Sequence, residues 1–241
     1  MICCQSLCKS FEGVPVLKDF SLTLPESGVV CLLSPSGGGK TTLLHILAGL
    51  SSPDSGSVEG LDGRKVSMVF QENRLLPWLS AAGNIALVQQ RGPKNTPPER
   101  YLAAAGLEGQ GEKRPGELSG GMKRRVAILR ALAFLEHEDR AVLLLDEPFK
   151  GLDRDAKTRM MQLVAARAER GDLVLLVTHD PEEAAALADR VFLCTASPLR
   201  VQGEMSLSLP RCRRDAAFLE RTRRELAGGL PRPASGGEIA P

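Results

Sequence analysis

Three short runs of the chain are almost wholly apolar, at residues 29–33, 141–145 and 173–177. A strand that is apolar at every position has both faces covered, as do the strands of a parallel sheet flanked by helices. The sequence therefore predicts an α/β fold with a mostly parallel central sheet.

The first 28 residues have a different pattern. Short β-like pieces at 2–7 and 16–24 are separated by Gly13 and Pro15, two residue types that are typical of turns. We expect these pieces to form an antiparallel β layer beside the main sheet.

The segment 72–118 is interrupted by five prolines. Short helical stretches at 81–90 and 98–105 lie between them, so this segment is predicted to be a helical insertion whose mobile loop is 91–97. Together with the start of the helix that follows, it is expected to form a helical subdomain of about residues 72–135.

A long helix is predicted after Ser119, a small polar residue suited to cap it. Its apolar positions recur at helical spacing, at Met122, Val126, Leu129 and Ala133. A second helix is predicted over 153–170, ending at Gly171. We expect one domain of residues 1–227, followed by a disordered tail at 228–241, where Gly, Pro and Ala dominate.

The composition is that of a soluble globular protein, with 43% hydrophobic and 25% charged residues. The net charge of +2 gives no reason to expect nucleic-acid binding. Six cysteines have neither the density of a disulfide scaffold nor paired metal-ligand spacing, which fits a reducing cytosol. No apolar run reaches the ~20 residues of a membrane span, so any membrane role is expected to come through a partner.

Unusual polar chemistry follows each apolar run directly. A Gly-rich loop follows the first, an Asp-Glu-Pro sequence at 146–148 follows the second, and a Thr-His-Asp sequence at 178–180 follows the third. Ligands of open α/β sheets bind at the carboxyl ends of the strands. We therefore expect these three strand ends to share one site.

The Gly-rich loop is predicted to cradle phosphate. Three glycines let the backbone wrap an anion with its N–H groups turned inward, and the helix that follows adds its positive dipole end. Lys40 supplies a point charge for outer phosphates, and the Thr41 hydroxyl is placed to ligate Mg²⁺. The usual motif begins with Gly where this chain has Ser34, and the alternative is a strand-to-helix turn without a ligand. The predicted phosphate-binding set is Ser34, Pro35, Ser36, Gly37, Gly38, Gly39, Lys40, Thr41 and Thr42.

Two adjacent carboxylates end the second apolar run, where isolated charges are costly without a cation or hydrogen-bond partners. Asp146 is suited to hold the Mg²⁺ shell and Glu147 to polarise an attacking water. The alternative is a strand that runs into an acidic turn.

A second anion site is predicted at Ser119, Gly120 and Gly121, 27 residues before Asp146. These residues begin the long helix and offer a hydroxyl and free backbone donors. One γ-phosphate has no need of two complete cradles from one domain, which suggests that the two come from two molecules. The alternative is a simple helix cap with flexible glycines.

Over residues 1–205 the chain resembles an ABC-family ATPase, the nucleotide-binding subunit of a membrane transporter. By this resemblance, 34–42 is the Walker A motif, Gln71 the Q-loop glutamine, 118–122 the signature motif, Asp146 and Glu147 the Walker B pair, 151–153 the D-loop and His179 the switch histidine. Phe11 stands where the family stacks an aromatic on adenine. The resemblance implies a P-loop NTPase (RecA-like) core that binds ATP and Mg²⁺.

The same resemblance implies a role for each residue. Glu147, Gln71 and His179 act in catalysis, and Thr41, Gln71 and Asp146 surround the metal. The remaining nucleotide contacts are Phe11, the Walker A residues, Ser119, Gly120, Gly121, Met122 and Asp153. Met122 stands where Gln is usual in the signature. Because this removes a side-chain amide, we expect weakened contacts to the opposite nucleotide, and we do not predict the turnover rate.

The segment between Gln71 and Ser119 is too short for the coiled-coil relatives that act in chromosome maintenance and DNA repair. The single motif set excludes the tandem translation-factor type. Residues 71–78 and 146–149 resemble the importer ATPases for nitrate, sulfonate and taurine, although Lys150 departs from the residues usual there.

This resemblance implies an ATP-hydrolysing subunit at the cytoplasmic face of the membrane. It would energise a separate permease, act with a solute-binding protein and form a homodimer with ATP. The solute is not predicted, because its selection belongs to other subunits.

Two other functions remain open. One is a soluble ABC ATPase in an assembly system such as iron–sulfur cluster delivery, and the other is a scaffold that binds ATP without hydrolysing it. The arginines of segment 211–224 could contact lipid or the permease, or form a solvated helix face.

Overall fold

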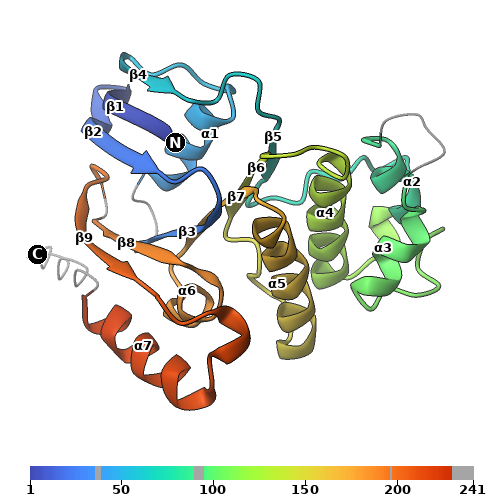
Figure 1. Cartoon of the computed structure of the whole chain (residues 1–241). Helices are drawn as coiled ribbons and strands as arrows, with labels where there is room; N and C mark the ends of the chain where they lie inside the picture. The colour runs from blue at the N-terminus through green and yellow to red at the C-terminus, as the bar shows by residue number, and fades with distance from the viewer. Residues whose placement is uncertain (36–38, 90–94, 196, 230–241) are drawn as a thin grey trace, which may run out of the picture.

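The computed structural model describes residues 1–35, 39–89, 95–195 and 197–229. Its central sheet has the strand order β5-β6-β7-β3-β8-β9 (Figure 1). The strands are β3 (Gly28–Leu33), β5 (Val66–Val69), β6 (Val142–Asp146), β7 (Leu173–Thr178), β8 (Arg190–Cys194) and β9 (Val201–Ser206). All neighbouring pairs are parallel except β8 and β9. The predicted mostly parallel α/β sheet is confirmed.

The middle strands are buried on both faces. Every residue of β6 and β7 is buried, and alternate residues enter two separate hydrophobic cores. Leu143 and Leu145 pack into the core beneath the helices, whereas Leu144 packs into the core shared with the N-terminal strands. This two-sided burial explains why both strands are apolar at every position before their last residue, Asp146 or Thr178.

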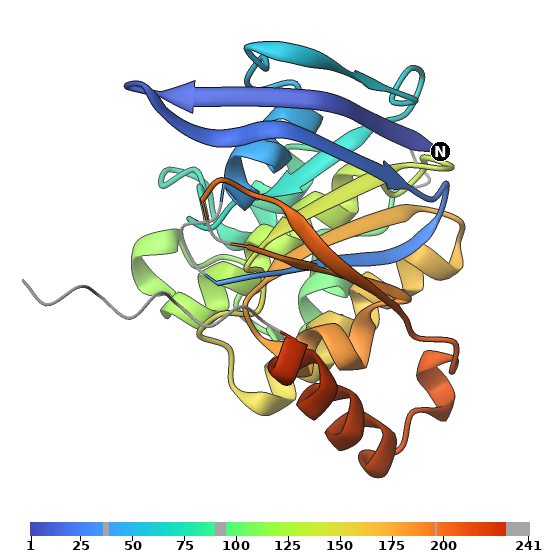
Figure 2. The ribbon, with the colours of Figure 1, turned by 90° about the vertical axis from the view of Figure 1, so that its left-hand side faces the viewer.

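A second sheet covers one face of the central sheet. It has the order β2-β1-β4, formed by β1 (Ile2–Phe11), β2 (Val14–Leu24) and β4 (Ser55–Glu59), and its pairs are antiparallel. Its apolar side shares a core with α1 (Lys40–Leu47), and Figure 2 shows the β1–β2 hairpin lying across the central strands. The predicted antiparallel β layer is confirmed.

The segment after β5 is helical. It contains α2 (Ala81–Ala86), α3 (Pro98–Ala104), a 3₁₀ turn at Pro115–Glu117 and α4 (Gly120–Phe134), and Figure 1 places α2 and α3 beside α4, away from the second sheet. The helix expected at 81–90 ends sooner, because the amides of Val88 and Gln89 bond three residues back, to Ile85 and Ala86. Residues 91–94 of the expected mobile loop lie outside the described part of the chain.

The remaining helices are α5 (Arg154–Glu169), α6 (Pro181–Leu187) and α7 (Ala216–Gly229), with a 3₁₀ turn at Arg211–Arg213. The prediction of a helix at 153–170 is confirmed, since Asp153 caps α5 and Arg170 ends it. Helix α7 includes residues 228–229, and the rest of the expected tail lies outside the described residues. None of the described helices is long and apolar enough to cross a membrane.

Part of the arginine-rich segment 211–224 is a solvated helix face. On α7, Glu220 accepts hydrogen bonds from Arg223 and Arg224, with N···O distances of 2.9 and 2.7 Å. These side chains are largely exposed. Exposed pairs of this kind contribute little to stability, so the ion pairs on this face of α7 are expected to add little to the free energy of unfolding.

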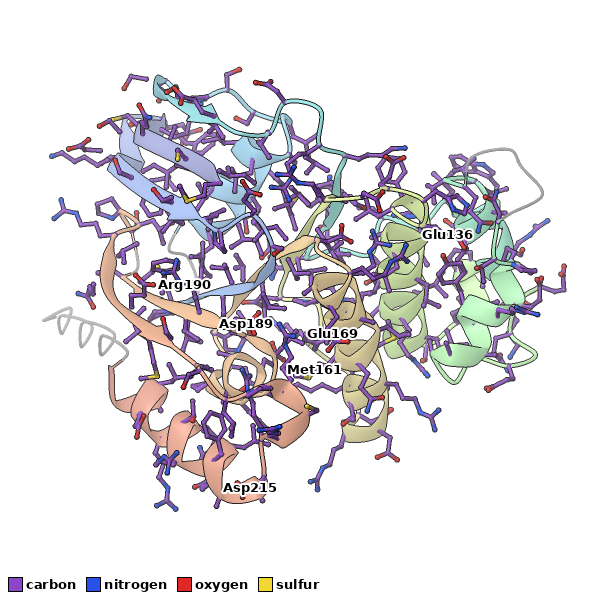
Figure 3. All side chains as sticks on the ribbon, viewed as in Figure 1. Glu136, Met161, Glu169, Asp189, Arg190 and Asp215 are labelled. Carbon is purple, nitrogen blue, oxygen red and sulfur yellow. The ribbon has the colours of Figure 1, made fainter. Side chains whose placement is uncertain are left out.

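Arg211 and Arg214, at the start of the segment, instead point inward. Arg211 donates from Nε to the carbonyl of Leu187 (2.7 Å) and pairs with Asp189, which is labelled in Figure 3. Arg214 donates from Nη1 to the carbonyl of Ala185 (3.0 Å). Both arginines therefore fasten the C-terminal segment to the end of α6, where the carbonyls of a helix lack partners.

A buried ion pair joins α5 to the start of the central sheet. Asp172 is 1% exposed, pairs with Arg167 at the end of α5 and accepts the amide of Ala141 at 2.8 Å. Its own carbonyl accepts the amide of Gly28 at 2.9 Å. One residue thus aligns three neighbouring strands.

We expect Asp172→Ala to lower the free energy of unfolding by about 3 kcal/mol, because Arg167 would keep a buried charge without its partner. Urea unfolding followed by circular dichroism measures the change. The control is Glu204→Ala, which breaks an exposed pair with Arg190 and should cause no measurable loss. Equal effects of the two variants would contradict a structural role for the buried pair.

Candidate functional site

The helix start after β3 depends on a glycine. Gly39 has φ of +83°, and a Cβ there would lie 2.6 Å from Cγ1 of Val16 and 2.9 Å from its carbonyl oxygen. Only glycine fits so close to β2 at that backbone angle. The three predicted loop residues Ser36, Gly37 and Gly38 lie outside the described residues.

Lys40 folds back onto this loop. Its Nζ donates to the carbonyl of Ser34 at 3.0 Å, to the Ser34 hydroxyl at 2.8 Å and to the carbonyl of Pro35 at 2.5 Å. Burial lowers the pKa of Lys40, although the nearby carboxylates of Glu147 and Asp146 oppose this shift. The loop thus holds one buried cation among neutral oxygens, which suits it to receive an anion.

Thr41 meets Asp146 across the sheet edge, with 2.6 Å between Thr41 Oγ1 and Asp146 Oδ2. Asp146 is 2% exposed, and burial raises its pKa despite this hydrogen bond. Both residues line a cavity of about 180 Å³ together with Gln71. A hydroxyl, a carboxylate and an amide oxygen are ligands that Mg²⁺ accepts, so the predicted metal residues fit that ion.

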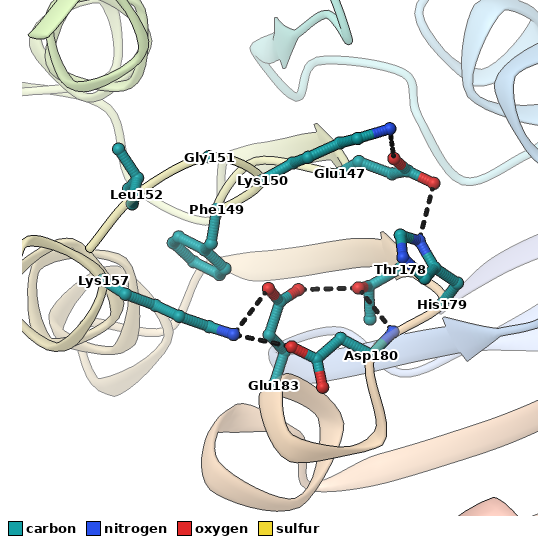
Figure 4. Close-up of a pocket in the computed structure, with 10 residues that line it drawn as sticks. All are labelled: Glu147, Phe149, Lys150, Gly151, Leu152, Lys157, Thr178, His179, Asp180 and Glu183. Atoms are coloured by element: carbon teal, nitrogen blue, oxygen red, sulfur yellow. Dashed lines mark hydrogen bonds and ion pairs between the residues drawn. The ribbon is translucent and has the colours of Figure 1, made fainter. Parts of the chain in front are cut away.

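Glu147 lies beside His179, the predicted switch histidine, in a second cavity of about 180 Å³ (Figure 4). His179 Nδ1 is 3.0 Å from Glu147 Oε1, and Lys150 Nζ is 3.4 Å from Oε2. Oε2 is buried and makes no hydrogen bond within the described part of the chain. The structure therefore brings the predicted base and histidine together and places the exposed Lys150 ammonium beside the second carboxylate oxygen.

The charge of Glu147 is set by opposing effects. Burial raises its pKa, but the hydrogen bond from His179 and the charges of His179 and Lys150 outweigh burial and lower the pKa below its ordinary value. The backbone φ of Glu147 is +44°, a left-handed angle that costs energy for any residue with a Cβ. The carboxylate is therefore ionised near neutral pH and held in a strained position.

Further side chains support the loop that carries His179. Lys157 of α5 pairs with Asp180 at 2.6 Å and with Glu183 at 2.9 Å, and Thr178 donates to Glu183 at 2.6 Å (Figure 4). Sequence reasoning missed this network. Lys157 and Glu183 lie in amphipathic helices, where charged residues are common and no spacing distinguishes these two.

The signature residues lie at the start of α4. The Ser119 hydroxyl accepts the amide of Met122 at 3.2 Å, and the Met122 side chain packs against the hydrophobic core. Gly120 and Gly121 line a cavity of about 240 Å³ with Gln71. The Walker A residues that the structure describes do not line this cavity. The chain's two predicted anion sites are therefore separate places in one molecule.

Two predicted nucleotide contacts have other partners. Asp153 accepts the amide of Ala156 at 2.9 Å and so caps α5. Phe11 is 51% exposed at the end of β1, with Lys9 Nζ 5.8 Å from its ring centroid. An exposed aromatic face agrees with the predicted adenine contact but does not test it.

Sequence reasoning also missed Arg124. This arginine is 4% exposed and donates to backbone carbonyls beside Gln71 and Glu147. It is the middle residue of a basic triplet at 123–125, and such a run is usually a solvated helix face. Nothing in the triplet shows which residue turns inward.

Three features meet at one edge of the parallel sheet. They are the helix start at Gly39 with the buried Lys40, the Thr41–Asp146 pair and the Glu147–His179 pair. Together they define a nucleotide-binding ATPase of the P-loop class.

The family described as ABC transporter matches residues 17–150. The aliphatic sulfonates import ATP-binding protein SsuB 2 of Pseudomonas syringae pv. tomato is 42% identical over 210 residues, covering 86% of this chain and 88% of that protein. Its counterpart SsuB 1 of Rhodococcus jostii is 43% identical over 225 residues, covering 91% and 89%. This chain belongs to the ABC transporter family, and it is an ATP-binding subunit that hydrolyses ATP.

Solved structures agree with this assignment. A dimeric bacterial ABC transporter cassette superposes with a TM-score of 0.74, and a dimeric post-hydrolysis cassette bound to ADP and Pi superposes with 0.73. Each is 29% identical and covers 87% of this chain and 100% of its own. The predicted P-loop NTPase fold and ATPase activity are thereby confirmed.

The contact between Lys150 and Glu147 generates a prediction about pH. Because Lys150 lowers the pKa of Glu147, Lys150→Ala should raise it, and the acid limb of ATP hydrolysis should move to higher pH. Steady-state phosphate release between pH 4.5 and 8 measures the shift. Lys150→Arg keeps the cation and should restore the limb. Identical profiles for all three proteins would show that Lys150 does not affect the base.

Proposed function

We propose that this chain energises a separate permease that imports an aliphatic sulfonate, working as an ATP-dependent homodimer at the cytoplasmic face of the membrane. The observation that carries the enzymatic part is the Glu147–His179 pair beside the Thr41–Asp146 pair. The sulfonate comes from the names of the relatives that match most of this chain. Nitrate and taurine remain related candidates. A solute-binding protein completes the proposed complex, because an ATPase of this kind does not itself select the solute.

Lys40 and the Walker A backbone are proposed to bind the phosphates of ATP. Lys40 would exchange its carbonyl partners for phosphate oxygens, a stronger interaction for a desolvated cation. Thr41, Asp146 and Gln71 would hold Mg²⁺, which neutralises phosphate charge when bound. Phe11 would stack on adenine with its exposed face.

Glu147 is proposed to orient the attacking water and accept its proton at Oε2, the oxygen that His179 does not bond. His179 fixes the other oxygen and is placed to contact the terminal phosphate. Gln71 lines the metal cavity and can orient the same water through its amide.

The proposed dimer follows from the separation of the two anion sites. A two-fold pairing would set the Ser119, Gly120 and Gly121 end of α4 against the nucleotide held by Lys40 of the second copy. Asp153 and Met122 would then lie at the interface, with Met122 contributing its backbone rather than a side-chain amide. The dimeric cassettes among the similar structures support this arrangement.

Glu147→Gln should retain ATP but lose at least ~10²-fold in hydrolysis, because the amide keeps the shape and cannot accept the proton. Phosphate release measures the rate, and size-exclusion chromatography with ATP should show a shift from monomer to dimer. Normal hydrolysis by this variant would require a different base.

Ser119→Arg should leave ATP binding to the monomer unchanged and stop turnover, since its bulk would block the facing surface. Lys40→Ala should also be inactive, because it loses the phosphate cation. A mixture of the two variants should recover activity, since one mixed dimer contains one intact composite site. Phosphate release across mixing ratios measures the recovery, provided that one site suffices.

A normal rate for Ser119→Arg alone, linear in protein concentration, would overturn both the signature assignment and the dimer. Met122→Gln is a matched control on the same turn, and it should leave turnover unchanged or raise it modestly.

The assembly-system alternative predicts no permease partner. Co-purification of the chain with a multi-span membrane protein separates the two functions. The non-hydrolysing scaffold is disfavoured, because the chain belongs to a family of ATPases and retains both the Glu147 carboxylate and His179.

A further inference from the structure

We propose that Arg124 is a positioning residue that sets the catalytic geometry of Gln71 and Glu147 from the signature helix. This inference rests on the proposed composite site, because it concerns the residues that act on the chain's own nucleotide.

All five N–H donors of the Arg124 guanidinium find backbone carbonyl oxygens. Nε donates to Pro148 at 2.8 Å, Nη1 donates to Phe70 and to Gln71 at 3.0 Å, and Nη2 donates to Asp146 at 2.8 Å and to Glu147. A guanidinium has five donors in a rigid planar fork, so these contacts use its full capacity.

Burial of the Arg124 guanidinium costs desolvation free energy, which the protein must recover through the contacts that the guanidinium makes. Arg124 is 4% exposed, and among the described residues no carboxylate forms an ion pair with it. Its charge is balanced by carbonyl dipoles and by the more distant fields of Asp146 and Glu147. Hydrophobic residues of similar volume are often as stable at such positions. Stability alone therefore does not account for an arginine here.

The accepting carbonyls belong to two separate segments. Phe70 and Gln71 directly follow β5, and residues 146–148 end β6 and begin the strained turn at Glu147. Four of the five accepting carbonyls belong to residues that line a site cavity, namely Phe70, Gln71, Asp146 and Glu147. A single rigid group thus fixes the Gln71 and Glu147 backbones relative to each other, and it extends from the second turn of α4.

Neighbouring arginines on α4 have different partners. Arg125 donates from Nη1 to the carbonyls of Ala105 and Gly106, at 2.9 and 3.2 Å, in the loop after α3. Arg130 donates to the carbonyl of Arg74 at 2.9 Å. Arg125 therefore gives a matched control: the same side chain on the same helix, with its two shorter hydrogen bonds to carbonyls outside the site and only a long 3.5 Å contact from Nε to the carbonyl of Gly121.

The first test compares Arg124→Lys with Arg125→Lys. Lysine keeps the charge but offers three donors from a point, so the five-carbonyl contact is lost. We expect kcat to fall at least ~10-fold for Arg124→Lys, because small misplacements of catalytic groups have large effects. KM for ATP and the monomer's ATP affinity should stay within about twofold. Arg125→Lys should keep both constants near those of the unaltered chain.

The second variant is Arg124→Met, which removes the buried charge together with all donors and so avoids an unpaired ammonium. It should bind ATP and lose turnover to a similar degree. If either variant loses ATP affinity and thermal stability in parallel with its rate, Arg124 is merely structural and the proposal fails. Unchanged kcat in both variants overturns it equally.

Mixed dimers give a sharper test. In the Ser119→Arg and Lys40→Ala mixture, the active site uses Glu147 and Gln71 of the Ser119→Arg chain and the signature helix of the other. Adding Arg124→Lys to the Ser119→Arg chain should lower the rate at least ~10-fold, whereas adding it to the Lys40→Ala chain should change it less than twofold. If Arg124→Lys lowered the rate equally in either chain of the mixed dimer, Arg124 would act by stabilising α4 in general, and the proposal would be overturned.

The proposed function and this inference fail differently. If the unaltered mixture recovers no activity, the composite dimer site is contradicted, and the kcat and KM of Arg124→Lys still decide the positioning role. If the mixture recovers activity and Arg124→Lys has normal turnover, only the positioning role is contradicted.

Discussion

The structure depends on the burial of β6 and β7 from both sides. Because neither strand has a face toward water, their side chains are apolar up to the last residue, and polar chemistry begins only at Asp146 and Thr178, where the strands end. Parallel pairing then brings those ends to the same edge. The site is assembled there because it is the first place along the strands where charged groups can meet water, a ligand or one another.

The polar and charged side chains at this edge are hydrogen-bonded to one another or to the loop backbone. Lys40 lies against loop carbonyls, Thr41 against Asp146, and His179 against Glu147. Each pairing gives one polar group of the predicted site a partner within the described part of the chain. Binding of a nucleotide then becomes an exchange of partners rather than the creation of new order, which keeps the reorganisation small.

The sequence was sufficient to predict the features that depend on the local pattern of apolar and polar residues. The apolar runs predicted the parallel strands, and the motif order predicted which residues meet at their ends. Long-range contacts were not accessible in this way. Lys157 and Arg124 are ordinary helix residues by sequence, and their importance comes from what tertiary packing sets opposite them. The early end of α2 likewise reflects a local turn that helix propensity does not record.

The left-handed backbone at Glu147 sets stability and activity in opposition at one residue. Glycine or asparagine would occupy that angle at a lower energetic cost, so the chain would gain stability by giving up the carboxylate that we propose as the base. A substitution that relieves the left-handed angle would therefore stabilise the fold and remove the proposed base together, so the two properties cannot both be improved at this position.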